Sequence, residues 1–386
     1  CRPTRHIAAR TSRVRVSSLT PPKTRRMRVR GQIKDIRMKH STLRDLLVGT
    51  ALMGLVLGAS AAFAGGPGYV FTANEAANSL SRIDLSTGQV ETVPLPIVPH
   101  NVDVSGRGQP LLVVGPMAMA DHGKAGQDMA GMEGHGESGL LAVLDPLDLA
   151  KAPRALIPVG EHPAHVVALS DGSFAFVTNA GENTVGVIDL VAGQMVARIP
   201  TGTYPHGMRL SPDQASLLVA NVEDGSVSLI DVASRTEVAR IPVGKTPVQV
   251  GFLPDGSRAF VSLRDENAVV VIDLAERKVM ARIPVGRGPI QLHASTDGRY
   301  VFVADQGSKD KPDNRVSVIE VAKGTVVASI ETGTAAHGVD ISDDGRSVFV
   351  TNVDDDTVTA IDIATLKVTA TYEVGDGPNG ITYLEP

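Results

Sequence analysis

Methionine and histidine side chains gather in one stretch of this sequence, residues 116–138, which reads PMAMADHGKAGQDMAGMEGHGES. Thioether sulfur is a preferred ligand of Cu(I), and imidazole nitrogen adds affinity for Cu(II) and Zn(II). Methionine usually fills cores rather than loops rich in glycine and alanine. The stretch therefore predicts a site for a soft metal, copper before zinc, with a low-complexity linker as the alternative. The candidate ligands are Met117, Met119, His122, Met129, Met132 and His135.

The spacing of Met129, Met132 and His135 resembles the Met/His-rich motifs of periplasmic copper-handling proteins. This resemblance is confined to the single stretch. It implies capture of copper in an exported compartment.

Four further histidines occupy similar places, each at the beginning of an apolar run. His100 and His206 directly follow a proline, His165 comes two residues after Pro163, and His337 follows an alanine. Neutral imidazoles are common ligands of copper and zinc. If these runs converge in the fold, three of the imidazoles can meet one ion.

The same histidines also have a reading without a metal. Gln249, Gln291 and Asn379 stand near the equivalent places of other runs, so the position could require only a polar side chain at a wet surface. Asp103 and Asp340 lie in the same runs as His100 and His337. In the metal reading we expect these two carboxylates to orient the imidazoles.

The elements that position these residues are set by an internal repeat of about 42 residues. One unit reads AFVTNAGENTVGVIDLVAGQMVARIPTG (175–202), and the next reads LLVANVEDGSVSLIDVASRTEVARIPVG (217–244). An acidic residue after an apolar run marks every unit, at Asp84, Asp145, Asp189, Asp231, Asp273, Glu320 and Asp362. The chain therefore holds seven units.

Each unit predicts four short strands, because alternating apolar residues are separated by turn residues at regular spacing. The fold class is all-β, a seven-bladed β-propeller of four-stranded blades. The chain enters at the second strand of a blade (69–74) and ends with a lone first strand (378–386). Pairing of these two segments would close the ring and remove exposed sheet edges. The stretch 116–138 and the segment 306–315 then insert on one face, where the four histidines also begin their strands.

The residues Val-Thr-Asn at 177–179 and 350–352, with the Ile-Asp anchors, resemble the YVTN-family β-propeller repeat over most of residues 69–386. The sequence departs from that repeat most at Val114-Gly115-Pro116. The resemblance implies an exported binding scaffold. Related propellers include lactonases and haem d1 carriers, so the resemblance leaves a hydrolase or a haem d1-type protein open as alternatives.

The N-terminal part differs from the repeats. Residues 1–37 form a basic extension that we expect to be absent from the mature protein. Residues 38–64 have a charged start, an apolar stretch and the cleavage pattern Ala62-Phe63-Ala64, which predict a signal peptide. The mature propeller would be residues 65–386, periplasmic or secreted and not membrane-spanning.

Charge and cysteine content exclude several functions. Of 37 basic and 42 acidic residues, 14 and two fall in residues 1–64, which leaves 23 basic and 40 acidic residues in the propeller. A surface so acidic repels phosphate backbones, so we expect no nucleic-acid partner. Cys1 is the one cysteine, so no CxxCH motif exists to attach a c-type haem.

Together these features predict an exported, non-catalytic binding protein that carries or buffers copper, or else zinc, on the face that bears the two insertions. A periplasmic protein partner on that face, bound without any metal, is the main alternative.

Overall fold

The computed structural model describes residues 67–118 and 138–386. The basic extension and the signal peptide predicted for residues 1–64 lie outside the described residues. So do five of the candidate metal ligands, Met119, His122, Met129, Met132 and His135.

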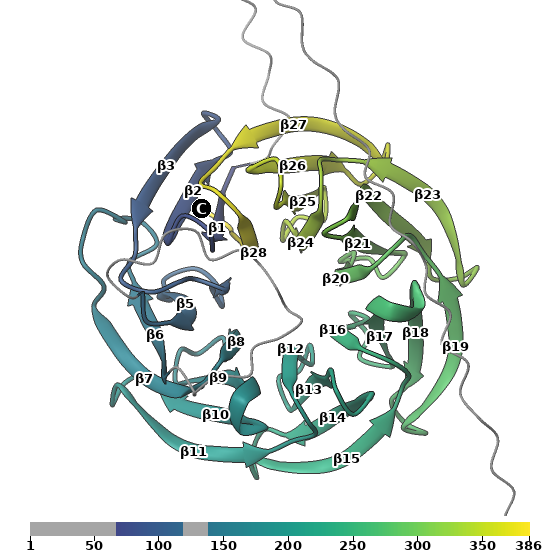
Figure 1. Ribbon diagram of the computed structural model, residues 1–386, viewed down its shortest axis with the longest axis horizontal. Coiled ribbons are helices and arrows are strands. Elements are labelled where there is room, and N and C mark those ends of the chain that lie inside the picture. Colours follow the sequence, from purple (N-terminus) through teal and green to yellow (C-terminus); the bar gives the residue numbers. More distant parts are fainter. Residues whose placement is uncertain (1–66, 119–137) are drawn as a thin grey trace, which may run out of the picture. The chain divides into compact units, whose positions relative to one another are not determined.

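The described chain forms seven four-stranded antiparallel sheets arranged as blades around a central axis (Figure 1). The all-β, seven-bladed propeller is thereby confirmed. Blades 1 to 3 consist of β28 (Pro378–Leu384), β1 (Tyr69–Asn74), β2 (Ser79–Asp84) and β3 (Gln89–Pro94); β4 (Asn101–Asp103), β5 (Leu111–Pro116), β6 (Ser138–Leu144) and β7 (Ala155–Glu161); and β8 (Pro163–Ala168), β9 (Phe174–Asn179), β10 (Thr184–Asp189) and β11 (Gln194–Pro200).

Blades 4 to 7 repeat the arrangement. They consist of β12 (Pro205–Leu210), β13 (Ser216–Asn221), β14 (Ser226–Asp231) and β15 (Thr236–Pro242); β16 (Pro247–Phe252), β17 (Arg258–Leu263), β18 (Ala268–Asp273) and β19 (Lys278–Pro284); β20 (Pro289–Ala294), β21 (Tyr300–Ser308), β22 (Lys311–Glu320) and β23 (Thr325–Glu331); and β24 (Ala336–Ile341), β25 (Ser347–Asn352), β26 (Thr357–Asp362) and β27 (Lys367–Glu373). Two short 3₁₀ turns, η1 (Ala180–Glu182) and η2 (Arg264–Glu266), connect strands in blades 3 and 5.

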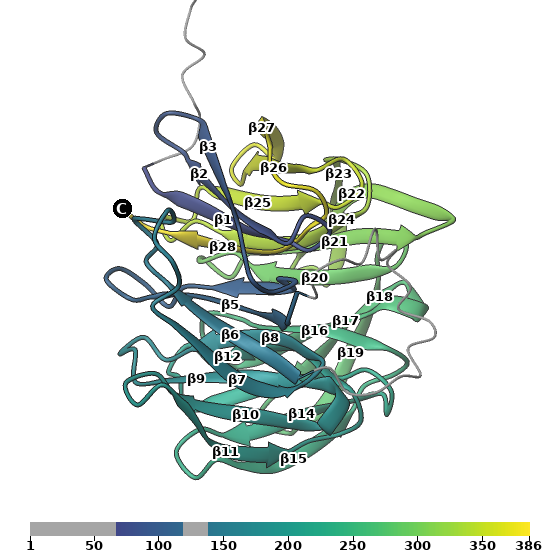
Figure 2. The same ribbon diagram turned by 60° about the vertical axis from the view of Figure 1, so that its left-hand side comes forward.

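The ring closes as the chain ends predict, because β28 pairs antiparallel with β1 (Figure 2). Tyr69 lies opposite Leu384, and Thr72 lies opposite Ile381. The first blade therefore takes three strands from the start of the propeller and its innermost strand from the end, so the inner edge of β1 is covered.

The acidic anchor of each repeat ends the third strand and holds the turn that follows. Oδ1 of Asp84 accepts hydrogen bonds from the backbone N–H groups of Ser86 and Thr87 at 2.8 and 3.2 Å. Oδ1 of Asp231 accepts from Ser234 in the same way. Aspartate stabilises turns through such local contacts, so the repeated Ile-Asp pair reports a strand end and no chemistry.

The core lies between neighbouring sheets. Each blade places a large apolar side chain from its second strand into this layer, for example Phe176, Phe260 and Phe349, all at most 2% exposed. Aliphatic residues such as Val269 and Leu292 fill the space around Phe260 between blades 5 and 6. A sequence without tryptophan thus builds seven similar apolar layers from valine, isoleucine and leucine. The second strands of five blades add one buried phenylalanine each.

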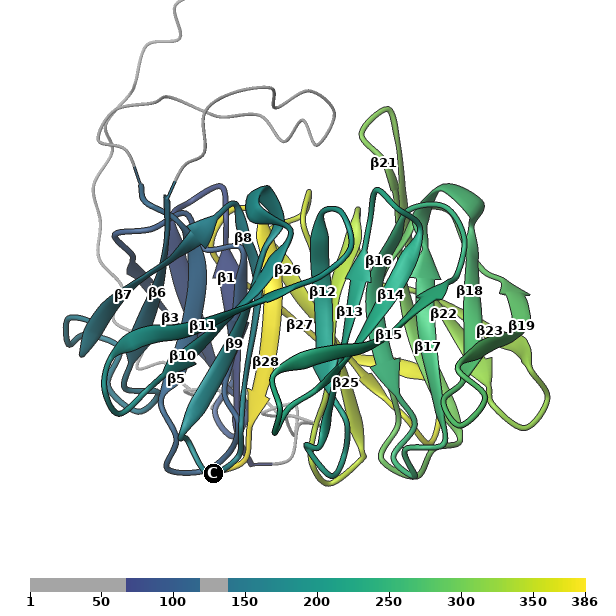
Figure 3. The same cartoon turned by 90° about the horizontal axis from the view of Figure 1, so that it is seen from below.

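One face of the propeller carries the start of every innermost strand and the connection between the second and third strands. In blade 2 the N–H of His100 donates to the carbonyl of Val114 at 2.9 Å, so Pro116, where the Met/His-rich stretch begins, leaves from the same face. The segment 306–315 continues β21 and β22 as a paired hairpin, with Ser308 opposite Lys311. It projects from this face in Figure 3. No helix among the described residues has the length and apolar character needed to cross a membrane.

Candidate functional site

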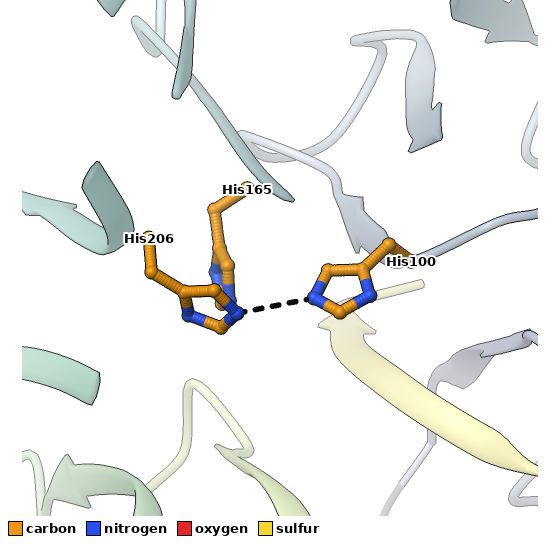
Figure 4. Close-up of side chains that lie close together, drawn as sticks. All are labelled: His100, His165 and His206. Carbon is orange, nitrogen blue, oxygen red and sulfur yellow. Dashed lines mark hydrogen bonds between the residues drawn. The ribbon is translucent and has the colours of Figure 1, made fainter. Parts of the chain in front are cut away.

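Three histidines from adjacent blades meet where the innermost strands begin. His100 directly precedes β4, His165 lies in β8 and His206 lies in β12. One ring nitrogen of each lies within 4.8 Å of the corresponding nitrogens of the other two. Figure 4 shows the three rings turned toward one another. We call these three residues the histidine cluster.

One pair in the cluster has the spacing of ligands around one ion. Nε2 of His100 lies 3.3 Å from Nε2 of His206. Two nitrogens bound at 2.0–2.1 Å to a tetrahedral zinc ion stand about 3.3 Å apart. The ring centres of His165 and His206 are 5.0 Å apart, and those of His165 and His100 are 6.1 Å apart. The ring of His165 is thus nearer to His206 than to His100. To complete a three-nitrogen site, it would have to move mainly toward His100.

A bulge in the innermost strands brings the side chains to the axis. In β8 the pairing with β9 shifts between Pro163 and Val166, and in β12 the pairing with β13 shifts between Pro205 and Met208. Bulges re-aim side chains next to functional sites. His165 lies one position further along its strand than His206, and blade 4 has Gly207 at that further position. An added Cβ at Gly207 would lie 2.3 Å from Oε1 of Gln249, so this position in blade 4 has no room for a side chain.

The cluster holds two of its three imidazoles in the neutral form that binds metals. His165 and His206 are each 3% exposed. Burial, together with the neighbouring imidazoles, lowers the pKa of His206 to about 3 and holds the pKa of His165 well below its ordinary value. Neutral imidazole is the ligand form of histidine, so a metal need not displace a bound proton from either ring at neutral pH.

Glu75 fixes the orientation of the third imidazole. Burial alone would lower the pKa of His100, but the charge of Glu75 and its hydrogen bond to His100 raise it above the ordinary value. Burial likewise opposes ionisation of Glu75, yet His100 lowers the pKa of this carboxyl to about 2. An ionised carboxylate only accepts hydrogen bonds, so Nδ1 of His100 carries the proton that Oε2 of Glu75 accepts at 3.2 Å. In the neutral ring, Nε2 of His100 then offers its lone pair to the cluster.

Glu75 accepts a second hydrogen bond, from the strand that closes the ring. Nδ2 of Asn379, in β28, also donates to Oε2 of Glu75. The backbone carbonyl of Asn379 lies 3.3 Å from Nδ1 of His337. Carboxylates that accept from a metal-ligating histidine fix its tautomer and increase its basicity, and Glu75 stands in that relation to His100.

His206 has the freedom to change tautomer. When its Nε2–H donates to Nε2 of His100, its Nδ1 atom keeps a lone pair, and this atom has no hydrogen-bond partner among the described residues. The carbonyl of Val248 lies near enough to raise the pKa of His206 slightly, although burial dominates. A metal on Nε2 would move the proton to Nδ1, where the Val248 carbonyl is available as an acceptor.

Three of the four histidines predicted as channel ligands meet in the described cluster. His100, His165 and His206 come from blades 2, 3 and 4, which are adjacent, whereas His337 comes from blade 7. His337 remains nearby: it is 7% exposed, and burial together with His100 lowers its pKa to about 4.

Other predicted positions have separate roles. Asp103 and Asp340 do not orient the cluster: Oδ2 of Asp103 accepts from the N–H of Ala168 at 3.1 Å, and Oδ2 of Asp340 accepts from that of Tyr383 at 2.8 Å. Met117 is the one methionine of the Met/His-rich stretch within the described residues. It is 56% exposed and bridges to Ile97 at the start of the stretch.

Sequence reasoning missed Glu75 and the hydrogen bonds of Asn379. A signal for Glu75 exists in the repeat. The residue that follows the last residue of the second strand is Ala180, Val222 or Val353 in blades 3, 4 and 7, and blade 1 alone has an acid there. A partly buried acid at a place where three other blades have an apolar residue suggests a charged partner.

Comparisons with known proteins agree with this fold. The sequence profile of the YNCE-like beta-propeller family matches residues 139–255 and 236–385. No curated protein matches the chain.

Solved structures with a similar fold come from proteins of different kinds. Hydrazine synthase from Kuenenia stuttgartiensis has 20% identity and a TM-score of 0.59, covering 75% of this chain and 90% of its own. A functionally unknown protein from Desulfotomaculum acetoxidans has 14% identity and a TM-score of 0.64, covering 82% and 99%. A putative 6-phosphogluconolactonase from Bacteroides fragilis has 16% identity and a TM-score of 0.62, covering 82% and 97%. At these identities the likeness concerns the fold alone.

Proposed function

The chain belongs to the YNCE-like β-propeller family, and we propose that it is a non-catalytic binding protein that holds one copper or zinc ion on the histidine cluster. The observation that carries the proposal is the meeting of three imidazole nitrogens within 4.8 Å at the channel mouth. The seven-bladed scaffold supports a binding role, because it presents side chains from separate blades at one point.

The ligand set favours a borderline metal. Three imidazoles suit Cu(II) and Zn(II), and a site of given geometry binds Cu(II) more tightly than Zn(II). The pairing of Glu75 with His100 at 3.2 Å is the outer-shell contact expected around a metal-bound imidazole. A site with three protein ligands leaves one position open, which suits an ion that must be passed on.

The role of carrier or buffer in an exported compartment rests on the sequence. The signal peptide expected at residues 38–64 would deliver the propeller to the periplasm or the exterior. The Met/His-rich stretch begins at Pro116, on the face that bears the cluster, and its thioethers would capture Cu(I) near the imidazoles. A protein partner on this face would donate or receive the ion.

A competition titration tests the proposal. Metal-stripped protein is titrated with Zn(II) and with Cu(II) against a chromophoric chelator, beside His100→Ala, His165→Ala and His206→Ala. We expect one ion per chain, and each substitution should lower affinity by at least about 100-fold, beyond the 10–100-fold loss typical of an outer-shell change. The matched control is His293→Ala, on β20 and outside the cluster, which should leave affinity unchanged.

Two results would count against the proposal. One is binding no tighter than micromolar in the unmodified protein. The other is tight binding that survives all three cluster substitutions. Circular dichroism of each variant separates a lost ligand from a lost fold.

A further inference from the structure

Arg209 lies on an innermost strand and has no hydrogen bond or ion pair with the other described residues. It belongs to β12, three residues after His206, and is half-buried. Because β12 is the innermost strand of blade 4, Arg209 lies beside the central channel. Its charge also acts on Asp103, His165 and His293, in blades 2, 3 and 6.

The guanidinium of Arg209 makes no hydrogen bond or ion pair with any described residue, and its Nε atom is fully buried. Several other half-buried arginines are paired. Arg82 bonds Glu91 at 2.7 Å, and Arg315 bonds Asp313 through two nitrogens at 2.7 and 2.9 Å. Because arginine stays protonated and only donates, Arg209 presents unused donors to the channel.

Unused donors recur on a second innermost strand. Nε2 of Gln291, in β20, is buried without a partner. Of the nine buried side-chain atoms that lack a partner in the described part of the chain, four belong to the innermost strands: His206 Nδ1, Arg209 Nε, Gln291 Nε2 and Asn379 Oδ1. Buried polar groups are nearly always satisfied. Two of these four atoms are donors that lie outside the histidine cluster, Arg209 Nε and Gln291 Nε2. The described part of the chain supplies no acceptor for either.

The nearby acids do not neutralise Arg209, and they restrict what can. Asp103 and Asp340 each hold a backbone N–H of a neighbouring blade, of Ala168 and of Tyr383. Asp340 also faces Nε2 of His293 at 3.6 Å. Neither carboxylate forms an ion pair with Arg209 among the interactions of the described residues. The charge of Asp340 near His293, and that of Asp103 when it is ionised, disfavour a multiply charged anion such as phosphate in this part of the channel.

We propose that the channel binds a small monocarboxylate whose oxygens accept hydrogen bonds from the Arg209 guanidinium. The planar fork of arginine matches a carboxylate in a bidentate pair, which is stronger than a neutral hydrogen bond. Gln291 offers a further donor on the innermost strand of blade 6. This site stands apart from the histidine cluster and does not require a bound metal.

Acetate is the probe, and metal-free protein is the sample. Acetate is titrated at constant ionic strength with chloride as the balancing anion, and binding is followed by nuclear magnetic resonance and by thermal unfolding. We expect a saturable response that chloride does not produce, and at least a tenfold weaker response in Arg209→Gln, because a charge-assisted hydrogen bond is lost. Arg209→Lys keeps the charge but removes the fork, so its response should also weaken.

The site is overturned if acetate gives no saturable response beyond chloride, or if the response is unchanged in Arg209→Gln. Phosphate that binds more tightly than acetate would overturn the monocarboxylate. Gln291→Leu keeps the arginine and removes only the second donor. If the Arg209 variants do not fold, the acetate response of Gln291→Leu can still be compared with that of the unmodified protein. Since the sample contains no metal, a failure of the metal proposal does not alter this result.

Discussion

Nδ1 of His100 lies 3.2 Å from Oε2 of Glu75, a residue 25 positions earlier that belongs to the preceding blade. The carboxylate accepts the Nδ1 proton, and Nε2 of the neutral ring consequently faces His206 across 3.3 Å. A contact between blades thus determines which nitrogen of His100 points into the histidine cluster.

Glu75→Gln is expected to weaken metal binding by about 10–100-fold without unfolding the protein. The amide keeps an acceptor for Nδ1 but loses the charge that stabilises the ligand tautomer. Competition titration with Zn(II) measures the affinity, and ¹⁵N chemical shifts of the His100 ring report the tautomer directly.

Glu223→Gln is the matched control for that substitution. Glu223 is an exposed acid in the equivalent connection of blade 4, and its loss should leave zinc affinity unchanged. Equal losses in the two variants would mean that general surface charge, and not the contact with His100, governs binding.

The repeat made the fold predictable, whereas the composition of the cluster needed coordinates. Seven acidic anchors define seven units, and the segments at 69–74 and 378–386 complement each other as the pair that closes the ring. The choice of His165 over His337 depends on which blades are adjacent and on how each bulge aims its side chain. The order of the repeats gives the adjacency of the blades, but repeat alignment treats all blades as equivalent and does not show how each bulge aims its side chain.

The part of the account that concerns Cu(I) depends on residues 119–137. A variant that lacks these residues should keep its Zn(II) affinity, because the histidine cluster remains, and should lose tight Cu(I) binding, because three of the four candidate thioethers are gone. Parallel titrations with Cu(I) and Zn(II) give the comparison. Unchanged Cu(I) affinity in the shortened chain would remove the basis for placing copper before zinc.

Asp305 should make the propeller less stable as the pH rises. It is fully buried within β21, with Oδ1 unpartnered and Oδ2 accepting from Ser317 at 2.7 Å. Burial raises its pKa from 3.8 to about 7. The folded state therefore holds a proton that the unfolded state releases above pH 3.8, and the resulting stabilisation is lost as pH rises through about 7.

Asp305→Asn should remove that dependence, because four other blades place an asparagine at this position, for example Asn221 with its donors on Ser226 and Ser228. The variant should gain up to about 4 kcal/mol over the unmodified protein at pH 8 and little at pH 4. Urea unfolding at the two pH values measures the difference. A gain of the same size at both would show that the carboxyl does not titrate as described.

The closing strand should be essential for stability. A chain that ends at Gly377 lacks β28 and exposes the partners of Ile381, Tyr383 and Leu384, which are at most 8% exposed. Burial of three such side chains contributes about 5 kcal/mol or more, comparable with the total stability of many domains. Thermal unfolding should show a broad, early transition.

A chain that ends at Leu384 serves as the control, since it lacks only the exposed Glu385 and Pro386. It should unfold like the full chain. A normal, cooperative transition in the chain that ends at Gly377 would show that pairing of β28 with β1 is dispensable.

X-ray absorption spectroscopy of the protein loaded with one equivalent of Zn(II) tests the central claim most directly. The account predicts a first shell of nitrogen or oxygen near 2.0–2.1 Å with outer-shell scattering from three imidazoles. It also predicts loss of one imidazole in His165→Ala. A first shell that contains sulfur, or one with a single imidazole, would contradict the assignment of the metal to His100, His165 and His206.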